Sequence, residues 1–191
     1  TAPQVRVYGP ANPGDGSAGN TRWGDTLAVR GSGTNTEVLI ASRGTQAAIL
    51  RPTDASMTTF SATTLHTDAP AGALGYGLAF GPGNTFYAKA ASSEGNPLYH
   101  LAYDFNTGTA TTLHVYGLNQ FPGRIGPLMT QVSSNWLAGI EMTSGSAPDL
   151  VRLYSISNPA SPPVFLDRVA VANWTNANVI FSGAVAFGET N

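Results

Sequence analysis

The chain has 191 residues, enough for one well-buried domain, and a formal net charge of −2. Only 10% of the residues are charged, and Lys89 is the only lysine beside eight arginines. The low charge and the lack of a basic stripe argue against binding to nucleic acid or to an anionic membrane surface. Cysteine is absent, which excludes disulfides and thiolate metal sites.

The composition favours an all-β protein that is exported. Gly, Thr, Ser, Asn and Ala supply most small and polar positions, as in chains of short strands and tight turns, and no segment places apolar residues at helical spacing. A cysteine-free, lysine-poor chain is typical of a bacterial exported protein, so we expect an extracellular or cell-surface location. The sequence contains no charged-then-apolar leader and no apolar run of eighteen residues, so neither a signal peptide nor a membrane anchor is expected in it.

A repeat of about 50 residues organises the chain. The tetrapeptide Thr-Thr-Leu-His occurs at residues 63–66 and again at 111–114, an offset of 48 residues. Each unit also begins with two short apolar runs in the same register. The first runs are at 26–29, 76–80 and 127–132, and the second runs are at 38–41, 85–88 and 135–138. We therefore expect three units of four strands, at about 23–68, 72–117 and 125–170.

The second unit gives the clearest prediction of individual strands, which are 76–80, 85–91, 98–103 and 109–116. Gly-Pro-Gly-Asn at 81–84 and Asp-Phe-Asn-Thr-Gly at 104–108 supply turn residues between them. In the third unit, the proline-rich stretch 159–163 predicts a turn that leads into an edge strand, where a missing backbone donor is tolerated.

Repeated units of four antiparallel strands are typical of the blades of a β-propeller. Residues 1–10 and 181–191 then form partial blades, so the single domain 1–191 holds about three whole blades and two partial ones. Such an arc is open, because natural rings have four to eight blades. Either the two ends join into one composite blade, or the chain is a fragment of a larger ring. We favour the fragment, whose partner is the remainder of its own propeller or a second copy.

Two segments resemble an uncharacterised family of bacterial exported β-propellers that occurs in extracellular multidomain proteins. They are residues 22–37 (RWGDTLAVRGSGTNTE) and 182–188 (SGAVAFG), the second being similar to that family's last inner strand. The resemblance implies an exported propeller and carries no established activity or catalytic residue. The stop at Asn191 departs from the family's pattern and puts closure of the ring in doubt.

No motif predicts catalysis or a cofactor. His66 and His114 hold equivalent outer-strand positions of different blades and should lie far apart, and His100 lies on a third strand, so no metal site is expected. There is no Gly-x-Ser-x-Gly motif, and Asp104 to Gly108 is expected to be a hairpin turn and not a calcium loop. The acids near predicted strand ends, which give no specific catalytic pair, are Asp25, Asp68, Glu94, Glu141 and Asp149.

The loops that join one blade to the next are where a propeller would bind a ligand. Aromatic, amide and guanidinium side chains there can stack on sugars or anchor a protein, although the tryptophans can equally fill gaps between blades. The candidate ligand-binding residues are Trp23, Asn119, Gln120, Phe121, Arg124, Trp174 and Asn176. We expect a non-enzymatic binding or scaffold module for a protein or glycan. The alternatives are a hydrolase or lyase acting on polysaccharide, and a purely structural spacer.

Overall fold

The computed structural model describes residues 23–42, 44–75, 77–89, 97–121, 125–141 and 148–175. These ranges hold twelve strands and one short 3-10 helix, so the expected all-β class is confirmed. No helix within them is long and apolar enough to cross a membrane. The partial blades expected at 1–10 and 181–191 lie outside the described residues.

The strands form three antiparallel meanders, in which each strand pairs with the next one along the chain. The first meander consists of β1 (Trp23–Arg30), β2 (Glu37–Ser42), β3 (Gln46–Pro52) and β4 (Phe60–Thr67), with the helix η2 (Gly33–Asn35) between β1 and β2. The second consists of β5 (Gly77–Phe80), β6 (Thr85–Lys89), β7 (Leu98–Asp104) and β8 (Thr109–Tyr116). The third consists of β9 (Ile125–Ser133), β10 (Trp136–Glu141), β11 (Pro148–Ser155) and β12 (Val164–Thr175).

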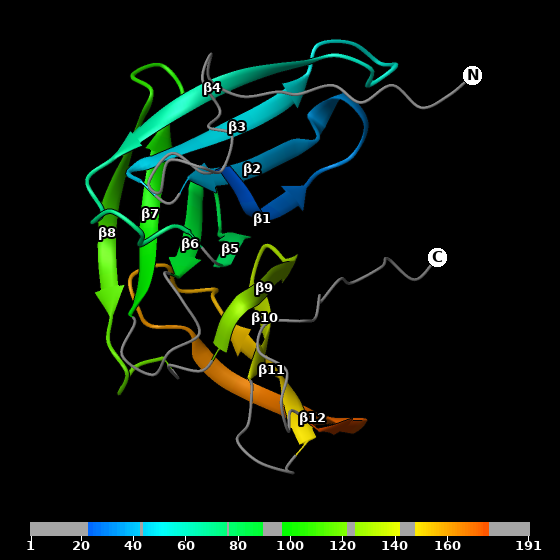
Figure 1. Cartoon of the computed structure of the whole chain (residues 1–191), viewed down its shortest axis with the longest axis vertical. Helices are drawn as coiled ribbons and strands as arrows, with labels where there is room; N and C mark the ends of the chain where they lie inside the picture. Colours follow the sequence, from blue (N-terminus) through cyan, green and yellow to red (C-terminus); the bar gives the residue numbers. More distant parts are fainter. Residues whose placement is uncertain are drawn as a thin grey trace.

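The first two meanders join into one mixed sheet, a connection that the predicted blades did not include. β4 and β8 pair in parallel at His66–Thr109 and Thr67–Ala110, giving the strand order β1-β2-β3-β4-β8-β7-β6-β5. The end strands β1 and β5 also lie in contact, so the eight-stranded sheet nearly closes. The third meander is a separate sheet whose β9 contacts β5, and Figure 1 shows the three meanders at the top, left and bottom of the molecule.

The turns within the meanders confirm the predicted turn chemistry. Gly83 (φ +60°) and Gly108 (φ +64°) take the left-handed conformation that glycine adopts without steric cost. The carboxylate of Asp104 accepts a hydrogen bond of 2.8 Å from the backbone amide of Asn106, which shapes a hairpin turn. The proline-rich stretch 159–163 lies between β11 and β12, and β12 is an edge strand as expected.

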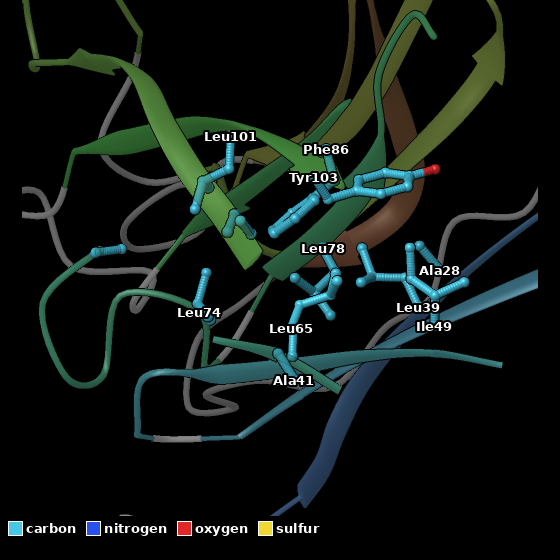
Figure 2. Packing of buried hydrophobic residues seen from close by; sticks show 14 of the residues in the cluster. Ala28, Leu39, Ala41, Ile49, Leu65, Leu74, Leu78, Phe86, Leu101 and Tyr103 are labelled. Atoms are coloured by element: carbon cyan, nitrogen blue, oxygen red, sulfur yellow. The ribbon is translucent and has the colours of Figure 1, made fainter. Parts of the chain in front are cut away.

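A first hydrophobic core lies between the first and second meanders. Figure 2 shows Leu39, Ile49 and Leu65 of the first meander beside Leu78 of β5, with Phe86 of β6 nearby. All five side chains are buried. Because apolar side chains alternate along these strands, each strand presents one face to this core.

A second, more polar core lies between the second and third meanders. Its eight members are Ala79, Tyr87, Leu98, Tyr116, Phe121, Leu137, Tyr154 and Ile156. Successive residues of β6 supply the two cores in turn, since Phe86 and Ala88 enter the first and Tyr87 enters the second. The second meander is therefore buried on both faces, which explains why β5 and much of β6 read as continuous apolar runs.

Candidate functional site

The predicted ligand-binding loop 117–124 connects β8 to β9, and its described part is a compact turn. The backbone amides of Gln120 and Phe121 donate to the carbonyl of Gly117 at 2.9 and 3.0 Å. The side-chain oxygen of Gln120 accepts a hydrogen bond from the amide of Gly117 at 3.1 Å. Asn119 and Gln120 are exposed, whereas Phe121 is only 1% exposed and its ring centroid lies 5.0 Å from that of Tyr154. Phe121 thus packs in the second core, and the Asn119 side chain is exposed.

The two candidate tryptophans lie on strands and not in loops. Trp23 is the first residue of β1, and its backbone pairs with Ser42 beyond an irregularity in the β1–β2 register. Trp174 lies one residue before the end of β12, which runs to Thr175 and so extends past the predicted boundary at 170. Arg124 and Asn176 lie outside the described residues. A ligand contact by any of these four residues stays a prediction.

Exposed apolar side chains occur on two segments at a junction between the second and third meanders. The hydroxyl of Tyr116, the last residue of β8, donates a 3.0 Å hydrogen bond to the carbonyl of Ser161 in the β11–β12 turn. Large apolar side chains that are about half exposed follow each of these two residues in the sequence. They are Leu118 after Tyr116, and Val164, Phe165 and Leu166 after Ser161. We call these four residues the junction patch. Asn119 and Gln120 of the predicted site adjoin it in sequence.

Aromatic rings beneath the junction patch hold it in place. Phe121 contacts Tyr154, and Tyr154 contacts Phe165 with 5.9 Å between ring centroids in an edge-on arrangement. Such contacts fix the rings more firmly than apolar burial alone. The patch is therefore presented by packed strands and a hydrogen-bonded turn, which is the property expected of a preformed binding surface.

The strongest polar constellation is an ion-pair network around Glu37, at one end of the first core. Arg30 donates from Nε to the Glu37 carboxylate at 2.7 Å, and Arg51 donates to its other oxygen at 2.8 Å. Arg30 also donates to the carbonyl of Gly83 at 2.6 Å and to the hydroxyl of Tyr103. The network thus ties β1, β2 and β3 to the second meander.

Electrostatics keep Glu37 ionised. Burial acts to raise the pKa of its carboxyl, but the hydrogen bonds and charges of Arg51 and Arg30 outweigh that effect, so the pKa lies below its ordinary value of 4.5. Both carboxylate oxygens are occupied by guanidinium groups, and the Arg51 guanidinium also stacks 3.4 Å from the centroid of the Phe105 ring. An ionised carboxylate with both oxygens occupied cannot serve as a general acid, and this network joins the first meander to the second instead.

The described carboxylates that were considered for catalysis are also engaged by neighbours. Asp68 accepts hydrogen bonds from the backbone amide and the hydroxyl of Thr112, at 2.8 and 2.7 Å, which links β4 to β8. Glu141 forms an ion pair with Arg152. The side chains of Asp25, Glu94 and Asp149 fall outside the described part of the chain. Within that part, no three His, Cys, Asp or Glu side chains gather in a way that could hold a metal ion.

The second core buries titratable side chains, among them His100, to which the sequence assigned no role. His100 of β7 is 0% exposed, its ring stacks on that of Tyr87 with 4.4 Å between centroids, and the ring of His114 lies 5.9 Å away on the other side. Neither nitrogen of His100 makes a hydrogen bond of ordinary geometry. The buried hydroxyls of Tyr87 and Tyr154 also lack such a hydrogen bond. Burial raises the pKa of Tyr154 to about 12 and lowers that of Lys89 to about 8. Buried polar atoms without partners are costly, so this core is the less stable of the two joints.

Comparison with known proteins adds no relative. The sequence matches no protein-family model and no curated protein. The resemblance to exported propellers therefore stays a prediction, and function has to be argued from the residues themselves.

Proposed function

We propose that the chain is a non-enzymatic module that binds a protein partner through the junction patch. The observation that carries this proposal is that Leu118, Val164, Phe165 and Leu166 are all about half exposed on the turn and the edge strand beside the Tyr116–Ser161 hydrogen bond. Isolated exposed apolar residues are normal, but several on adjoining segments are typical of protein contacts. Three of the four are aliphatic, which suits a protein better than a glycan, because sugars stack on aromatic rings.

The enzyme alternative gains no support from the described polar groups. Glu37, Glu141, Asp68 and Asp104 each accept contacts that serve the fold, and an active acid–base pair needs carboxylates aimed at an open site. Binding is thus the function that the geometry supports best.

We further propose that the module is part of an exported bacterial propeller, with each meander forming one blade. The innermost strands β1, β5 and β9 contact one another, and the second meander packs against a neighbour on each face. The first meander carries exposed Leu27 and Val29 on β1, on the face turned away from the first core. The remainder of the propeller, or a second copy, would cover such a face.

Site-specific photo-crosslinking in the producing cells tests the binding proposal. A photo-reactive phenylalanine analogue at Leu118 or Leu166 should yield a discrete adduct that contains one partner protein. The matched control places the analogue at Asn106, an exposed residue of the β7–β8 turn, at the opposite end of β8 from Leu118. The partner's purified form should bind the chain, and Val164→Asp with Leu166→Asp should weaken that binding at least tenfold. Equal adducts from all three positions, or binding that the double variant leaves unchanged, would contradict the proposal.

Binding to a glycan array or turnover of a polysaccharide gives a different result. Glycan binding that depends on Asn119 and survives the Val164→Asp and Leu166→Asp changes would favour a sugar ligand. Release of reducing ends from a polysaccharide by the purified chain would favour the hydrolase alternative.

A further inference from the structure

The joint between the second and third meanders buries a histidine, and among the described residues no carboxylate acts on its charge. His100 is completely buried on the face of β7 that packs against the third meander, and neither ring nitrogen has an ordinary hydrogen-bond partner. The backbone of Pro159, in the β11–β12 turn, is the polar group of the third meander that favours its protonated form. The described members of the first core include no buried histidine like His100. They are apolar apart from the Tyr103 hydroxyl, which contacts Arg30.

Within the described part of the chain, the charged and titratable groups near this joint do not offer His100 a carboxylate. From the second meander, Tyr87 and Lys89 lie on β6, and His114 and Tyr116 lie on β8. From the third meander come Tyr154 and the ion pair of Glu141 with Arg152, whose carboxylate is already engaged. Burial and the charge of His114 both lower the pKa of His100, so they oppose an imidazolium there.

We propose that His100 is an acid-sensitive latch, whose protonation releases the third meander from the second while the first core stays intact. Protonation would place a cation in a buried joint beside His114, and the protein relieves this cost by exposing the ring to water. The proposal goes beyond the binding function and is independent of it. Release would separate β11 and β12, which carry Tyr154 and three residues of the junction patch, from the turn that carries Leu118.

The sign and size of the effect follow from the environment of the ring. Burial and the neighbouring His114 lower the pKa of His100 from 6.5 to about 4. The closed joint therefore holds the neutral ring, and its stability is fully present above pH 6.5 and is lost as the pH falls toward 4. Between pH 7 and pH 5 the equilibrium constant for opening should rise about 20-fold.

Amide hydrogen exchange at pH 7 and pH 5, corrected for the intrinsic rate, tests the latch in the whole chain. The released third meander loses the core that covers its apolar face and then unfolds, so protection of β10 and β11 should fall about 20-fold, while protection of β2 and β3 should change less than threefold. Glu37 stays ionised at pH 5, so the network at the first core is unaffected. A parallel loss of protection in all four strands would mean general acid unfolding and would overturn the proposal.

Two variants assign the effect to His100. His100→Phe keeps an aromatic ring against Tyr87 and cannot be protonated, so the dependence on pH should disappear. His66→Phe removes an exposed histidine on β4 and should leave the 20-fold change intact. If His100→Phe does not fold, His100→Gln gives the same comparison with a smaller polar side chain. A 20-fold fall that persists in a folded His100 variant refutes the latch.

Discussion

Replacing Glu37 by Gln removes the negative charge that two arginines share and keeps the shape of the side chain. Arg30 and Arg51 then face a neutral amide, and Tyr103 stays beside an unpaired guanidinium. Removal of one partner from a fully buried ion pair costs about 3–5 kcal/mol. The side chains of Arg30 and Arg51 are 23% and 45% exposed, so water compensates part of this loss. We expect the free energy of unfolding to fall by about 2 kcal/mol.

Urea unfolding followed by tryptophan fluorescence measures this loss, and Glu141→Gln is the matched control. Glu141 pairs with a single arginine, Arg152, so its substitution should cost about 1 kcal/mol. The dependence on pH gives a second readout. Because the pKa of Glu37 is lowered in the folded protein, its contribution is present above pH 4.5 and is lost as the pH falls through the folded value. Glu37→Gln should lack this loss. A cost under about 0.5 kcal/mol would refute the view that the network joins the sheets.

Three further substitutions test the fold, each by the free energy of unfolding in urea. Leu39→Ala empties part of the first core, where Leu39 is fully buried, and should cost about 3 kcal/mol; a cost below about 1 kcal/mol would show that the core repacks. Gly31→Ala forces a side chain into φ +76° and against the carbonyl oxygen of Asn35, so it should cost about 3 kcal/mol, whereas Gly33→Ala meets no neighbour and should cost about 1 kcal/mol. Equal costs for the two glycines would contradict this reasoning. Asp68→Ala removes both hydrogen bonds to Thr112 and should cost about 1 kcal/mol, and no measurable cost would mean that this link between β4 and β8 adds nothing.

Local patterns were enough to place most strands and turns. The four strands expected in the second unit correspond to β5, β6, β7 and β8, because β-branched and apolar runs between Gly, Asn and Pro residues identify short strands. β12 extends past residue 170, the approximate end expected for the third unit, because its pairing runs from Ser155–Val164 through Pro148–Thr175. A long-range partner strand sets that limit, and local sequence does not contain it.

The features that depend on the meeting of distant segments escaped prediction. The contact of His100 with His114 arises because the β7–β8 register shifts by one residue between His100 and Leu101, and only this shift brings the two histidines opposite each other. The Glu37 network likewise needs the meeting of β1, β2 and β3 with the β5–β6 turn. For the candidate ligand site, the sequence identified the exposed turn at Asn119 but not the apolar residues of β12 near it. Their exposure depends on which edge of the third sheet remains open.

The pairing of β4 with β8 sets the order in which this polypeptide can assemble during synthesis. Each meander contains only nearest-neighbour pairings, so its loops close over short distances and it can form soon after its own residues are made. The seam between the first two meanders, however, uses β8, the last strand of the second, and not β5, the first. The first meander must therefore wait for about fifty more residues before it gains its hydrogen-bonded neighbour. If the ribosome pauses within that interval, the apolar face of the first meander stays exposed and β4 stays without its partner strand.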